Sequence, residues 1–413
     1  MATMSVDFSS KLESLVNNAV KKVQDNPIKK VFFVLGNESA DLDSIVGSIS
    51  YAYLSTQFCP LNTVYLPIIQ IPRFDLSLRP ECNFIFQKCE ISTASLIFLD
   101  EISDHLYIIS KSYSLSLVLL DHNKLIGIWN QFADKVDTIL DHHQDEGLYL
   151  NIKERYIEGV GSATSLVVLK FKDKWENNLN DNKQIDKDTQ NWDKIIANLL
   201  LSAILVDTVL LDFSQGRTTQ KDQDAVDFLL DILHPSDPKT FIKDYYNEIQ
   251  NAKFNISHLS NFDLLQKDYK EYNLEWNIKN ETKICVMGIS SVVWILKDWI
   301  LREDGVEKFM ETVGNYIQEK NLDLEIIMLA FDHKGDLGFK REMVIYSKKG
   351  PFCQKEVLER FEEIIGLNEI KDFRNVNSDR EKEESIIKCY EQKNISMSRK
   401  KVYPIIKNMF LEA

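Results

Sequence analysis

Cysteine is scarce in this chain, and no two cysteines have the spacing of a metal or redox motif. Six cysteines occur among 413 residues, and the sequence contains no Cys-x-x-Cys pair. That pattern suits neither a zinc ribbon nor a framework of disulfides. We therefore expect reduced thiols and a cytoplasmic protein.

Long hydrophobic runs are also missing. The most apolar stretch, residues 195–211, is shorter than the ~20 residues that a membrane span requires, and it contains Asp207. The N-terminus has no basic segment that leads into an apolar core, so no secretory signal is expected. The run is better interpreted as a buried element, and the carboxylate inside it needs its own explanation.

Positive charge is in deficit. The 49 Lys and Arg residues against 63 Asp and Glu residues leave a net charge of −14, which argues against broad coating of nucleic acid or an anionic membrane. A polyanionic substrate remains compatible if positive charge is concentrated in one cleft. The 44% hydrophobic and 27% charged residues exclude a mainly disordered or collagen-like chain. At roughly 150 residues per domain, the length predicts two or three domains.

Strand-like and helical patterns alternate in the first half of the chain. The apolar run 29–35 ends at Gly36 and predicts a buried parallel strand, and Asp43-Ser44 predicts the N-cap of a helix that continues to Leu54. Such alternation predicts an α/β fold with a doubly wound, mainly parallel sheet, whose ligands bind beyond the carboxyl ends of the strands. Further strand candidates are 63–69, 95–99, 115–120 and 136–140.

A domain boundary is predicted where two prolines interrupt the helical pattern, at 233–239. We assign an N-terminal domain to 1–232, a linker to 233–240 and a smaller second α/β domain to 241–413. The polar segment 172–191 is expected to be a solvated insertion loop. The second domain has strand candidates at 283–288 and 324–331 and a basic cluster at 398–401.

Acidic residues and histidines follow three of the apolar runs. Because the carboxyl ends of parallel strands open on the same edge of a sheet, these groups are expected to meet there. Carboxylates gathered in a partly buried site repel one another strongly unless cations are present, so the pattern predicts a metal site. Oxygen and imidazole ligands favour Mg²⁺, Mn²⁺ or Co²⁺. The groups are Asp41-Leu-Asp43-Ser44, Asp121-His122-Asn123 and Asp141-His142-His143.

Two ions are a natural hypothesis for this cluster. Asp41 and Asp43 could each face a different ion, and ions ~3.5–4 Å apart need bridging carboxylates, for which Asp121 and Asp207 are candidates. Bridging would explain a carboxylate within the apolar run. Any one of these groups alone is more often a turn, a helix cap or a hydrogen-bonded carboxylate, and Asp332-His333 is expected to be such a doublet. The prediction therefore depends on their joint occurrence.

The motifs together resemble those of a known family. GNESADLDS (36–44), LLDHN (119–123) and DHHQDEG (141–147), followed by Asp207, are similar to the metal-site motifs of the DHH phosphoesterase superfamily. SRKKVYP (398–404) resembles the signature of the DHH-associated domain of exopolyphosphatases, prune-type proteins and family II inorganic pyrophosphatases. The resemblance implies an active site in the cleft between the two domains.

The resemblance also implies a role for each matching residue. Asp41 would bind the first ion, Asp43 and His142 the second, and Asp121 and Asp207 both. His143 would face the phosphate and polarise or protonate it, so the catalytic residues would be His143, Asp121 and Asp207. The substrate-binding residues would be His143, Lys270, Arg399, Lys400 and Asn37.

Asn37 is the departure that separates the sub-families. In family II pyrophosphatases this position is a histidine that ligates the first ion, and its loss should weaken Mn²⁺ or Co²⁺ more than Mg²⁺. First motifs of the GNESAD type resemble those of eukaryotic cytosolic exopolyphosphatases. We therefore predict an exopolyphosphatase that releases orthophosphate from the end of inorganic polyphosphate with two divalent ions, Mg²⁺ or Mn²⁺, with Co²⁺ as a third candidate. We expect a monomer that binds neither nucleic acid nor membrane.

Other functions stay open from the sequence. The first is an enzyme with another substrate, either an inorganic pyrophosphatase or a prune-like short-chain polyphosphatase or cyclic nucleotide phosphodiesterase. The second is a prune-like regulatory binding protein, although every metal carboxylate and both histidines of the Asp-His-His group are intact. A DHH-type exonuclease is a distant third, because the C-terminal signature is of the phosphatase type and the chain is acidic.

Overall fold

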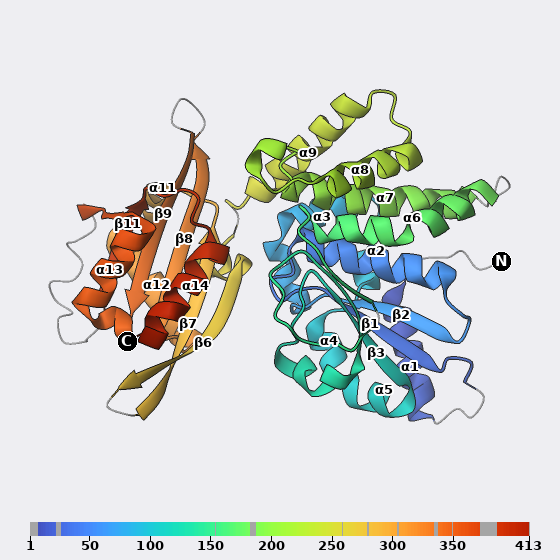
Figure 1. Ribbon diagram of the computed structural model, residues 1–413, viewed down its shortest axis with the longest axis horizontal. Helices are drawn as coiled ribbons and strands as arrows, with labels where there is room; N and C mark the ends of the chain where they lie inside the picture. Colours follow the sequence, from blue (N-terminus) through green and yellow to red (C-terminus); the bar gives the residue numbers. More distant parts are fainter. Residues whose placement is uncertain are drawn as a thin grey trace. The chain divides into compact units, whose positions relative to one another are not determined.

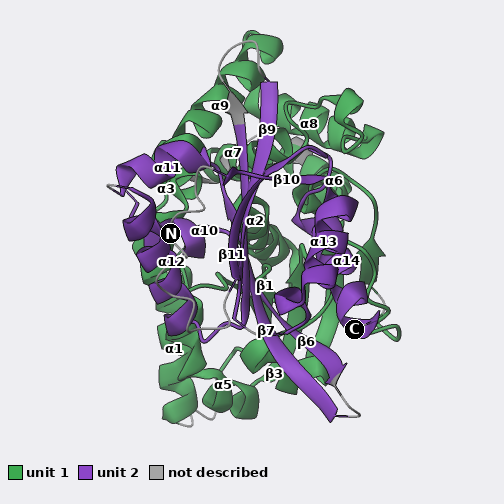
Figure 2. Ribbon diagram, turned by 90° about the vertical axis from the view of Figure 1, so that its left-hand side faces the viewer, with its two compact units in different colours: residues 1–255 green, residues 256–413 purple. Residues whose placement is uncertain are grey.

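The computed structural model divides the chain into two compact units, Met1–Asn255 and Ile256–Ala413. Each unit has its own sheet and its own hydrophobic core (Figures 1 and 2). The structure describes residues 7–21, 26–152, 154–181, 187–257, 259–278, 281–303, 305–333, 338–348, 350–371 and 386–412.

The first unit is built on a five-stranded sheet in the order β2-β1-β3-β4-β5, in which every neighbouring pair is parallel. The central strands are apolar along almost their whole length because both faces of the sheet are covered. The predicted parallel sheet is confirmed, as are the strand candidates 29–35, 63–69, 115–120 and 136–140. The strands are β1 (Lys30–Leu35), β2 (Thr63–Ile68), β3 (Ser114–Leu120), β4 (Val136–Asp141) and β5 (Glu154–Ile157).

Helices cover both faces of this sheet, so it is doubly wound (Figure 1). One face carries α2 (Leu42–Phe58), α6 (Ala163–Asp181), α7 (Lys187–Asp207) and α8 (Gln220–Leu233), with α3 (Pro80–Lys88) and α9 (Pro238–Phe254) packed beside them. The other face carries α1 (Phe8–Val20), α4 (Leu99–Ser103) and α5 (Leu106–Ser112). Short 3₁₀ helices are η1 (Arg73–Leu78), η2 (Thr93–Ser95), η3 (Gly127–Lys135) and η4 (Phe213–Gln215).

Two local predictions in the first unit are wrong. Residues 95–99 do not form a strand: they join the end of η2 to the start of α4, with a single bridge between Ile69 and Phe98. A short buried apolar run gives no periodicity that distinguishes a strand from other buried backbone. The N-cap of α2 is Asp41, whose Oδ1 accepts a hydrogen bond from Ser44 N at 3.2 Å, and not the Asp43-Ser44 junction.

The predicted insertion loop at 172–191 is also wrong where the structure describes it. Residues 172–181 complete α6 and 187–191 begin α7, while 182–186 lie outside the described residues. Trp175 explains the helix, because its ring is buried and its indole N–H donates to Asp193 Oδ1 at 2.8 Å. A few well-spaced aromatic residues thus hold polar helix ends against the core.

The division between the units lies one helix beyond the predicted linker. Helix α9 packs against α3 and α7 and belongs to the first unit, which ends at Asn255. Pro238 stands in the first turn of α9, where a missing N–H has no cost, and Pro235 lies in the short turn between α8 and α9.

The second unit contains a six-stranded sheet in the order β10-β11-β9-β8-β7-β6, in which only β7 and β8 pair in parallel. The candidates 283–288 and 324–331 are confirmed as parts of β7 and β8. The strands are β6 (Tyr269–Ile278), β7 (Glu281–Val292), β8 (Leu324–His333), β9 (Gly338–Ser347), β10 (Leu367–Glu369) and β11 (Ile386–Gln392).

Helices lie on both faces of the second sheet as well (Figure 2). On one face are α13 (Lys355–Ile365) and α14 (Arg399–Glu412), and on the other are α10 (Asn261–Lys267), α11 (Leu296–Arg302) and α12 (Val306–Glu319). The 3₁₀ helix η5 (Pro351–Cys353) packs beside α13. Both faces are therefore buried, and the unit has the three-layer build of an α/β domain.

All six cysteines lie in the described part of the chain and carry free thiols. In the same residues no helix is long and apolar enough to cross a bilayer. The apolar run 195–211 is part of α7 and the turn after it, and α7 lies within the first core.

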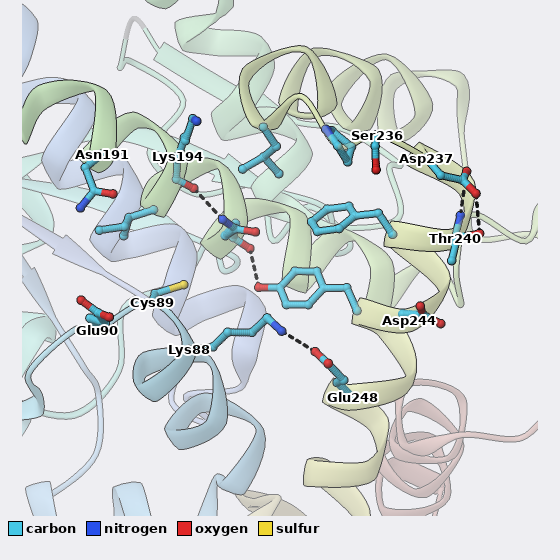
Figure 3. Close-up of a pocket in the computed structure, with 16 residues that line it drawn as sticks. Lys88, Cys89, Glu90, Asn191, Lys194, Ser236, Asp237, Thr240, Asp244 and Glu248 are labelled. Atoms are coloured by element: carbon cyan, nitrogen blue, oxygen red, sulfur yellow. Dashed lines mark hydrogen bonds and ion pairs between the residues drawn. The ribbon is translucent and has the colours of Figure 1, made fainter. Parts of the chain in front are cut away.

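A cavity of about 750 Å³ opens in the first unit at α3, α7 and α9 (Figure 3). Lys88 Nζ and Glu248 Oε2 form an ion pair of 2.5 Å across it. Its lining holds more acidic than basic side chains, so it does not suit a polyanion. The acidic residues are Glu90, Asp237, Asp244 and Glu248, and the basic ones are Lys88 and Lys194.

Candidate metal centre

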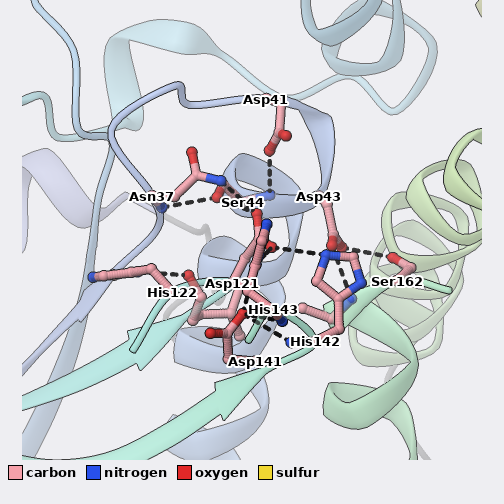
Figure 4. A network of polar contacts seen from close by, with 12 residues as sticks. Asn37, Asp41, Asp43, Ser44, Asp121, His122, Asp141, His142, His143 and Ser162 are labelled. Atoms are coloured by element: carbon pink, nitrogen blue, oxygen red, sulfur yellow. Dashed lines mark hydrogen bonds and ion pairs between the residues drawn. The ribbon is translucent and has the colours of Figure 1, made fainter. Parts of the chain in front are cut away.

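Three polar segments meet at the carboxyl edge of the parallel sheet (Figure 4). The segment that follows β1 carries Asn37 to Ser44, Asp121 follows β3 directly, and Asp141 is the last residue of β4. In the sheet register, Leu35 pairs with Leu119 and Leu120 pairs with Leu140, so the three strands end side by side. The expected meeting of these groups at one edge is therefore present in the fold.

Asp121 lies at the centre of the cluster. It is buried and has a left-handed backbone with φ of 63°, a costly conformation for a residue with a Cβ. Its Oδ2 accepts hydrogen bonds from Asn37 Nδ2 at 2.7 Å and from Ser44 Oγ at 2.8 Å. Its Oδ1 faces the histidines, 3.2 Å from His142 Nε2 and 3.4 Å from His143 Nδ1. These contacts hold the strained residue in place.

Two buried carboxylate oxygens at this edge accept no hydrogen bond among the described residues: Oδ2 of Asp207, and Oδ1 of Asp121, whose neighbours are the ring nitrogens of His142 and His143. Asp207 is the last residue of α7, where the partial negative charge of the helix end disfavours a carboxylate. Buried polar atoms without partners cost free energy, and native proteins rarely keep them. A cation is the partner that both oxygens lack.

The pKa values of the cluster also indicate a cation site. Burial raises the pKa of Asp121 to about 7, and the neighbouring Asp41 and Asp43 add to the effect. Burial also raises the pKa of Asp207 well above its usual range, again with contributions from neighbouring carboxylates. Burial would lower the pKa of His142, but the carboxylates around it, Asp121 above all, raise it to about 10. The site therefore holds more negative charge than its own residues can balance.

Two of the five predicted metal ligands, Asp121 and His142, form a close group with His143, and the other three act electrostatically on the same cluster. Asp121, His142 and His143 each offer one ligand atom within 4.8 Å of the others. The pKa of Asp207 responds to Asp41, Asp43, Asp121 and His142, which places all of these in one electrostatic neighbourhood. Oxygen donors with one or two imidazoles are the ligand set of Mg²⁺, Mn²⁺ or Co²⁺, so the residues present fit a divalent ion.

Asp43 is held by the N-terminus of α6. Its Oδ1 accepts from Ser162 Oγ at 2.7 Å and from Thr164 N at 3.0 Å, and its Oδ2 accepts from Ala163 N at 2.8 Å. A carboxylate at a helix N-terminus is favoured by the free N–H groups and by the helix dipole. These three bonds fix the direction of the Asp43 carboxylate.

His143 is oriented by Asp141. The Nδ1 atom of His143 lies 2.8 Å from Asp141 Oδ1, which also accepts from His142 N and His143 N. Asn123 Nδ2 donates to the other oxygen of Asp141 at 2.5 Å. Burial would raise the pKa of Asp141, but the hydrogen bonds from His143 and Asn123 hold it at about 2. An ionised Asp141 accepts a hydrogen bond from Nδ1–H of His143, so Nε2 of His143 is the nitrogen available to a substrate.

Asn37 supports Asp121 from inside the protein. It is buried, its Nδ2 donates to Asp121, and its Oδ1 accepts from Ser39 N at 2.9 Å and Ala40 N at 3.1 Å. Contact of Asn37 with a substrate stays a prediction, since the observed bonds of the amide are internal. The absence of an imidazole here leaves a neutral donor beside a carboxylate that the resemblance assigns to the metal.

No sequence motif identified Arg79, which holds the loop before Asp41. Arg79 is buried, and its guanidinium donates to Ala40 O at 2.8 Å and to Ser39 O at 2.5 Å. Ala40 has a left-handed backbone with φ of 45°, so the loop needs such support. The only local signal is an arginine in a loop between two helical segments, which is too common to identify a role.

In the second unit, Arg399 and Lys270 lie around Asp268. Arg399 Nη2 is 2.7 Å from Asp268 Oδ1, and Nη1 donates to Asp268 O at 3.0 Å. Burial would raise the pKa of Asp268, but Arg399 and then Lys270 lower it below its usual range. The structure therefore brings these two predicted phosphate-binding residues together on one carboxylate.

Lys400 lies exposed beside Arg399 in the first turn of α14. The side chains of Arg399 and Lys400 add positive charge to the positive end of the helix dipole, and the free backbone N–H groups of the first turn also attract negative charge. This turn therefore suits an anion. The doublet Asp332-His333 ends β8, and its side chains lie outside the described residues.

The chain thus combines a doubly wound parallel sheet, which has carboxylates and imidazoles at its strand ends, with a second α/β unit. Two family models match the chain, the N-terminal domain of the DHH family over residues 31–204 and the DHHA2 domain over residues 247–409.

Individual proteins are similar over most of the chain. A protein of Schizosaccharomyces pombe, provisionally named an exopolyphosphatase, is 30% identical over 91% of this chain and 89% of its own length. The exopolyphosphatase PRUNE1 of Mus musculus is 27% identical over 96% of this chain and 78% of its own length. The crystal structure of a protein of Methanococcus jannaschii, provisionally named a family II inorganic pyrophosphatase, shares the fold with a TM-score of 0.55 and 21% identity over 92% of this chain and 99% of that one.

The chain belongs to the DHH phosphoesterase superfamily, in its exopolyphosphatase branch. It is an enzyme of the exopolyphosphatase and pyrophosphatase type. The resemblance drawn from the sequence motifs is confirmed.

Proposed function

We propose that this enzyme is a metal-dependent exopolyphosphatase that hydrolyses the terminal phosphoanhydride bond of inorganic polyphosphate and releases orthophosphate. The observation that carries the proposal is the pair of buried carboxylate oxygens, Asp121 Oδ1 and Asp207 Oδ2, that accept no hydrogen bond among the described residues; the first of them lies 3.2 Å from His142 Nε2. The substrate is supported by relatives that are named exopolyphosphatases.

The residues that would hold the ions are Asp41, Asp43, Asp121, His142 and Asp207, with two ions, Mg²⁺ or Mn²⁺, as the expected occupants and Co²⁺ as a third candidate. When bound, such ions supply positive charge that stabilises a phosphoryl group under attack and make water a better nucleophile. The excess negative charge of the site supports this part of the proposal.

His143 acts on the phosphoryl group in this mechanism. Because Asp141 accepts a hydrogen bond from Nδ1–H of His143, Nε2 is the ring nitrogen left to face a phosphoryl oxygen. In the imidazolium form, this Nε2–H donates a hydrogen bond to that oxygen or hands its proton over as charge develops there. Asn123 keeps Asp141 in position, so the three side chains act as one support. The partial exposure of His143, at 28% of its side chain, leaves room for contact with a substrate.

Arg399, Lys400 and Lys270 of the second unit bind the more distal phosphates in the same proposal. A guanidinium can hold two phosphate oxygens at once, and lysines add point charges. The ion pair of Arg399 with Asp268 fixes the guanidinium before a substrate arrives, which lowers the entropy lost on binding.

The test is release of orthophosphate from polyphosphates of defined length, from tripolyphosphate and from pyrophosphate, with Mg²⁺, with Mn²⁺ and after treatment with EDTA. We expect polyphosphate to be the best substrate and EDTA to abolish activity. Pyrophosphate as the best substrate would replace the proposal with a pyrophosphatase. Binding of polyphosphate without turnover under any metal would favour the regulatory binding protein.

A further inference from the structure

We propose that Asp222, in the first turn of α8, is a positioning residue for one half of the metal centre, the half formed by Asp43 and His142. The inference rests on the proposed metal-dependent function. It concerns a side chain that the metal-site motifs of the sequence do not include.

Asp222 has an unusually full set of hydrogen bonds for a residue with no accessible surface. Within α8 it closes a capping box, in which its Oδ2 accepts from Thr219 N at 2.8 Å and from Thr219 Oγ1 at 2.7 Å. The same carboxylate reaches a distant segment: Oδ2 accepts from Gly161 N at 2.9 Å, and Oδ1 accepts from Ser162 N at 3.3 Å and Ser165 Oγ at 2.7 Å. A helix cap alone does not require the second group of bonds.

The segment that Asp222 holds, residues 160–164, contacts both of the predicted metal ligands Asp43 and His142. Val160 O lies 3.2 Å from His142 Nδ1, which directs the Nε2 atom of His142 towards Asp121. On the other side of Gly161, the Ser162 hydroxyl and the next two backbone N–H groups bind Asp43. Hydrogen bonds of this outer kind set the tautomer and direction of metal ligands. Asp222 therefore fixes the stretch of backbone that orients both ligands.

Close packing makes this arrangement intolerant of movement. A Cβ on Gly161 would lie 2.5 Å from Thr208 Cγ2 and 3.1 Å from Asp222 Oδ2. Thr208 directly follows Asp207. A shift of Gly161 would thus disturb the end of α7 as well as the start of α6.

The remaining aspartate of the first motif is held differently. Asp41 caps α2 through Ser44 N, and Arg79 binds the loop before it. Loss of Asp222 should therefore weaken one of two ion sites and leave the other near its normal affinity.

The experiment is a titration of metal-free protein with Mn²⁺ by calorimetry, with no substrate present, beside thermal unfolding of the same metal-free samples. The variants are Asp222→Asn, which places an amide against donor groups, and Ser165→Ala, which removes one bond and is mild enough to fold. Asp263→Asn is the matched control, because Asp263 closes the same capping box with Ser260 in α10 of the second unit.

We expect Asp222→Asn to weaken one class of Mn²⁺ sites about 10- to 100-fold, and Ser165→Ala to weaken it about two- to fivefold. Asp263→Asn should keep the Mn²⁺ affinity of the natural protein even if its unfolding temperature falls. Normal Mn²⁺ affinity in both Asp222→Asn and Ser165→Ala would overturn the inference, whatever their stability. Absence of Mn²⁺ and Mg²⁺ binding in the natural protein would instead overturn the proposed function, and the inference with it.

Discussion

At the scale of single residues, the candidate centre is a set of carboxylates held where their charges are costly. Asp121 is buried and Asp207 is half-buried, both have raised pKa values, and each has a buried oxygen that accepts no hydrogen bond among the described residues. Sites that are strained or charged in this way persist because function requires them, at the expense of stability. One substitution in this cluster should separate function from stability, and a second should change the metal preference.

Asp207→Asn should abolish phosphate release while the metal-free protein becomes more stable. The amide removes a buried charge that neighbouring carboxylates repel, so the unfolding temperature in EDTA should rise by about 2–4 °C. The measurement is calorimetric unfolding in EDTA together with a phosphate-release assay. Asp212→Asn is the control: Asp212 is half-buried, and hydrogen bonds from Ser214 and Gln215 lower its pKa, so this change should not raise stability. Full activity in Asp207→Asn would contradict the role of this carboxylate.

Asn37→His should change the metal preference. The amide now donates to Asp121 Oδ2 at 2.7 Å, and an imidazole at this position would offer a nitrogen ligand that Mn²⁺ and Co²⁺ bind better than Mg²⁺ does. We expect the Mn²⁺ affinity to rise about tenfold relative to Mg²⁺, with a gain in pyrophosphate hydrolysis. Calorimetric titration with each ion checks the first part, and an unchanged ratio of affinities would remove Asn37 as the residue that separates the sub-families.

At the scale of elements, the two sheets hold their acidic residues differently. Strands of the first sheet carry them at or beyond their ends, whereas β7 and β8 of the second sheet bury one between them. In the second sheet, β7 and β8 lie side by side and enclose Glu325, which has no accessible surface. Burial raises its pKa to about 8, although Ser290 Oγ donates to it at 2.7 Å. Its Oε2 has no partner among the described residues. This pair of strands therefore takes up a proton when it folds.

The raised pKa of Glu325 predicts how stability depends on pH. Because its folded pKa of about 8 lies above the ordinary value of 4.5, the stabilising contribution is complete below pH 4.5 and is lost as the pH rises to about 8. Glu325→Gln keeps a hydrogen bond to Ser290 without the ionisation. The variant should gain up to about 4 kcal/mol over the natural protein between pH 5 and pH 8.5. Unfolding by denaturant across this range checks it, and a difference that does not change with pH would refute the assignment.

At the scale of the whole molecule, the proposed function requires a chain with a net charge of −14 to attract a polyanion. We expect polyphosphate to approach where positive charge is concentrated locally, and the predicted group of Arg399, Lys270 and Lys400 in the second unit would provide that charge. Interactions of this kind weaken as salt screens them, over about 10 Å at 0.1 M ionic strength.

Arg399→Ala should therefore raise the KM for polyphosphate more than it lowers kcat, and it should reduce the dependence of KM on salt. The physical reason is the loss of one cation from the substrate-binding group. Kinetics between about 50 and 300 mM KCl measure both effects. Arg360→Ala is the control in the same unit, because Arg360 is exposed and pairs with Glu412 at 2.8 Å, apart from the predicted group. An unchanged salt dependence in Arg399→Ala would count against its role.

The sequence alone determined the parallel sheet, the order of its motifs and the residues that meet at its edge. Apolar runs that end in Asp and His identify β1, β3 and β4, because burial on both faces leaves a continuous hydrophobic signal. The hydrophobic signal is weaker in half-exposed β5 and in the antiparallel strands of the second sheet. The polar ends of α6 and α7 have the composition of a loop, although they are helical. Local patterns record how much of a segment is buried and say little about what buries it.

Only the tertiary structure decided how the predicted ligands are held. Arg79 reaches Ala40 from 39 positions away, and Asp222 reaches Gly161 from 61 positions away, so neither contact leaves a trace in local periodicity. Ionised Asp141 beside His143, the left-handed backbone of Asp121 and the cap of α6 on Asp43 are likewise products of the folded chain. The sequence motifs specify which residue types form the centre. The orientation of these residues depends on hydrogen bonds between segments that only folding brings together.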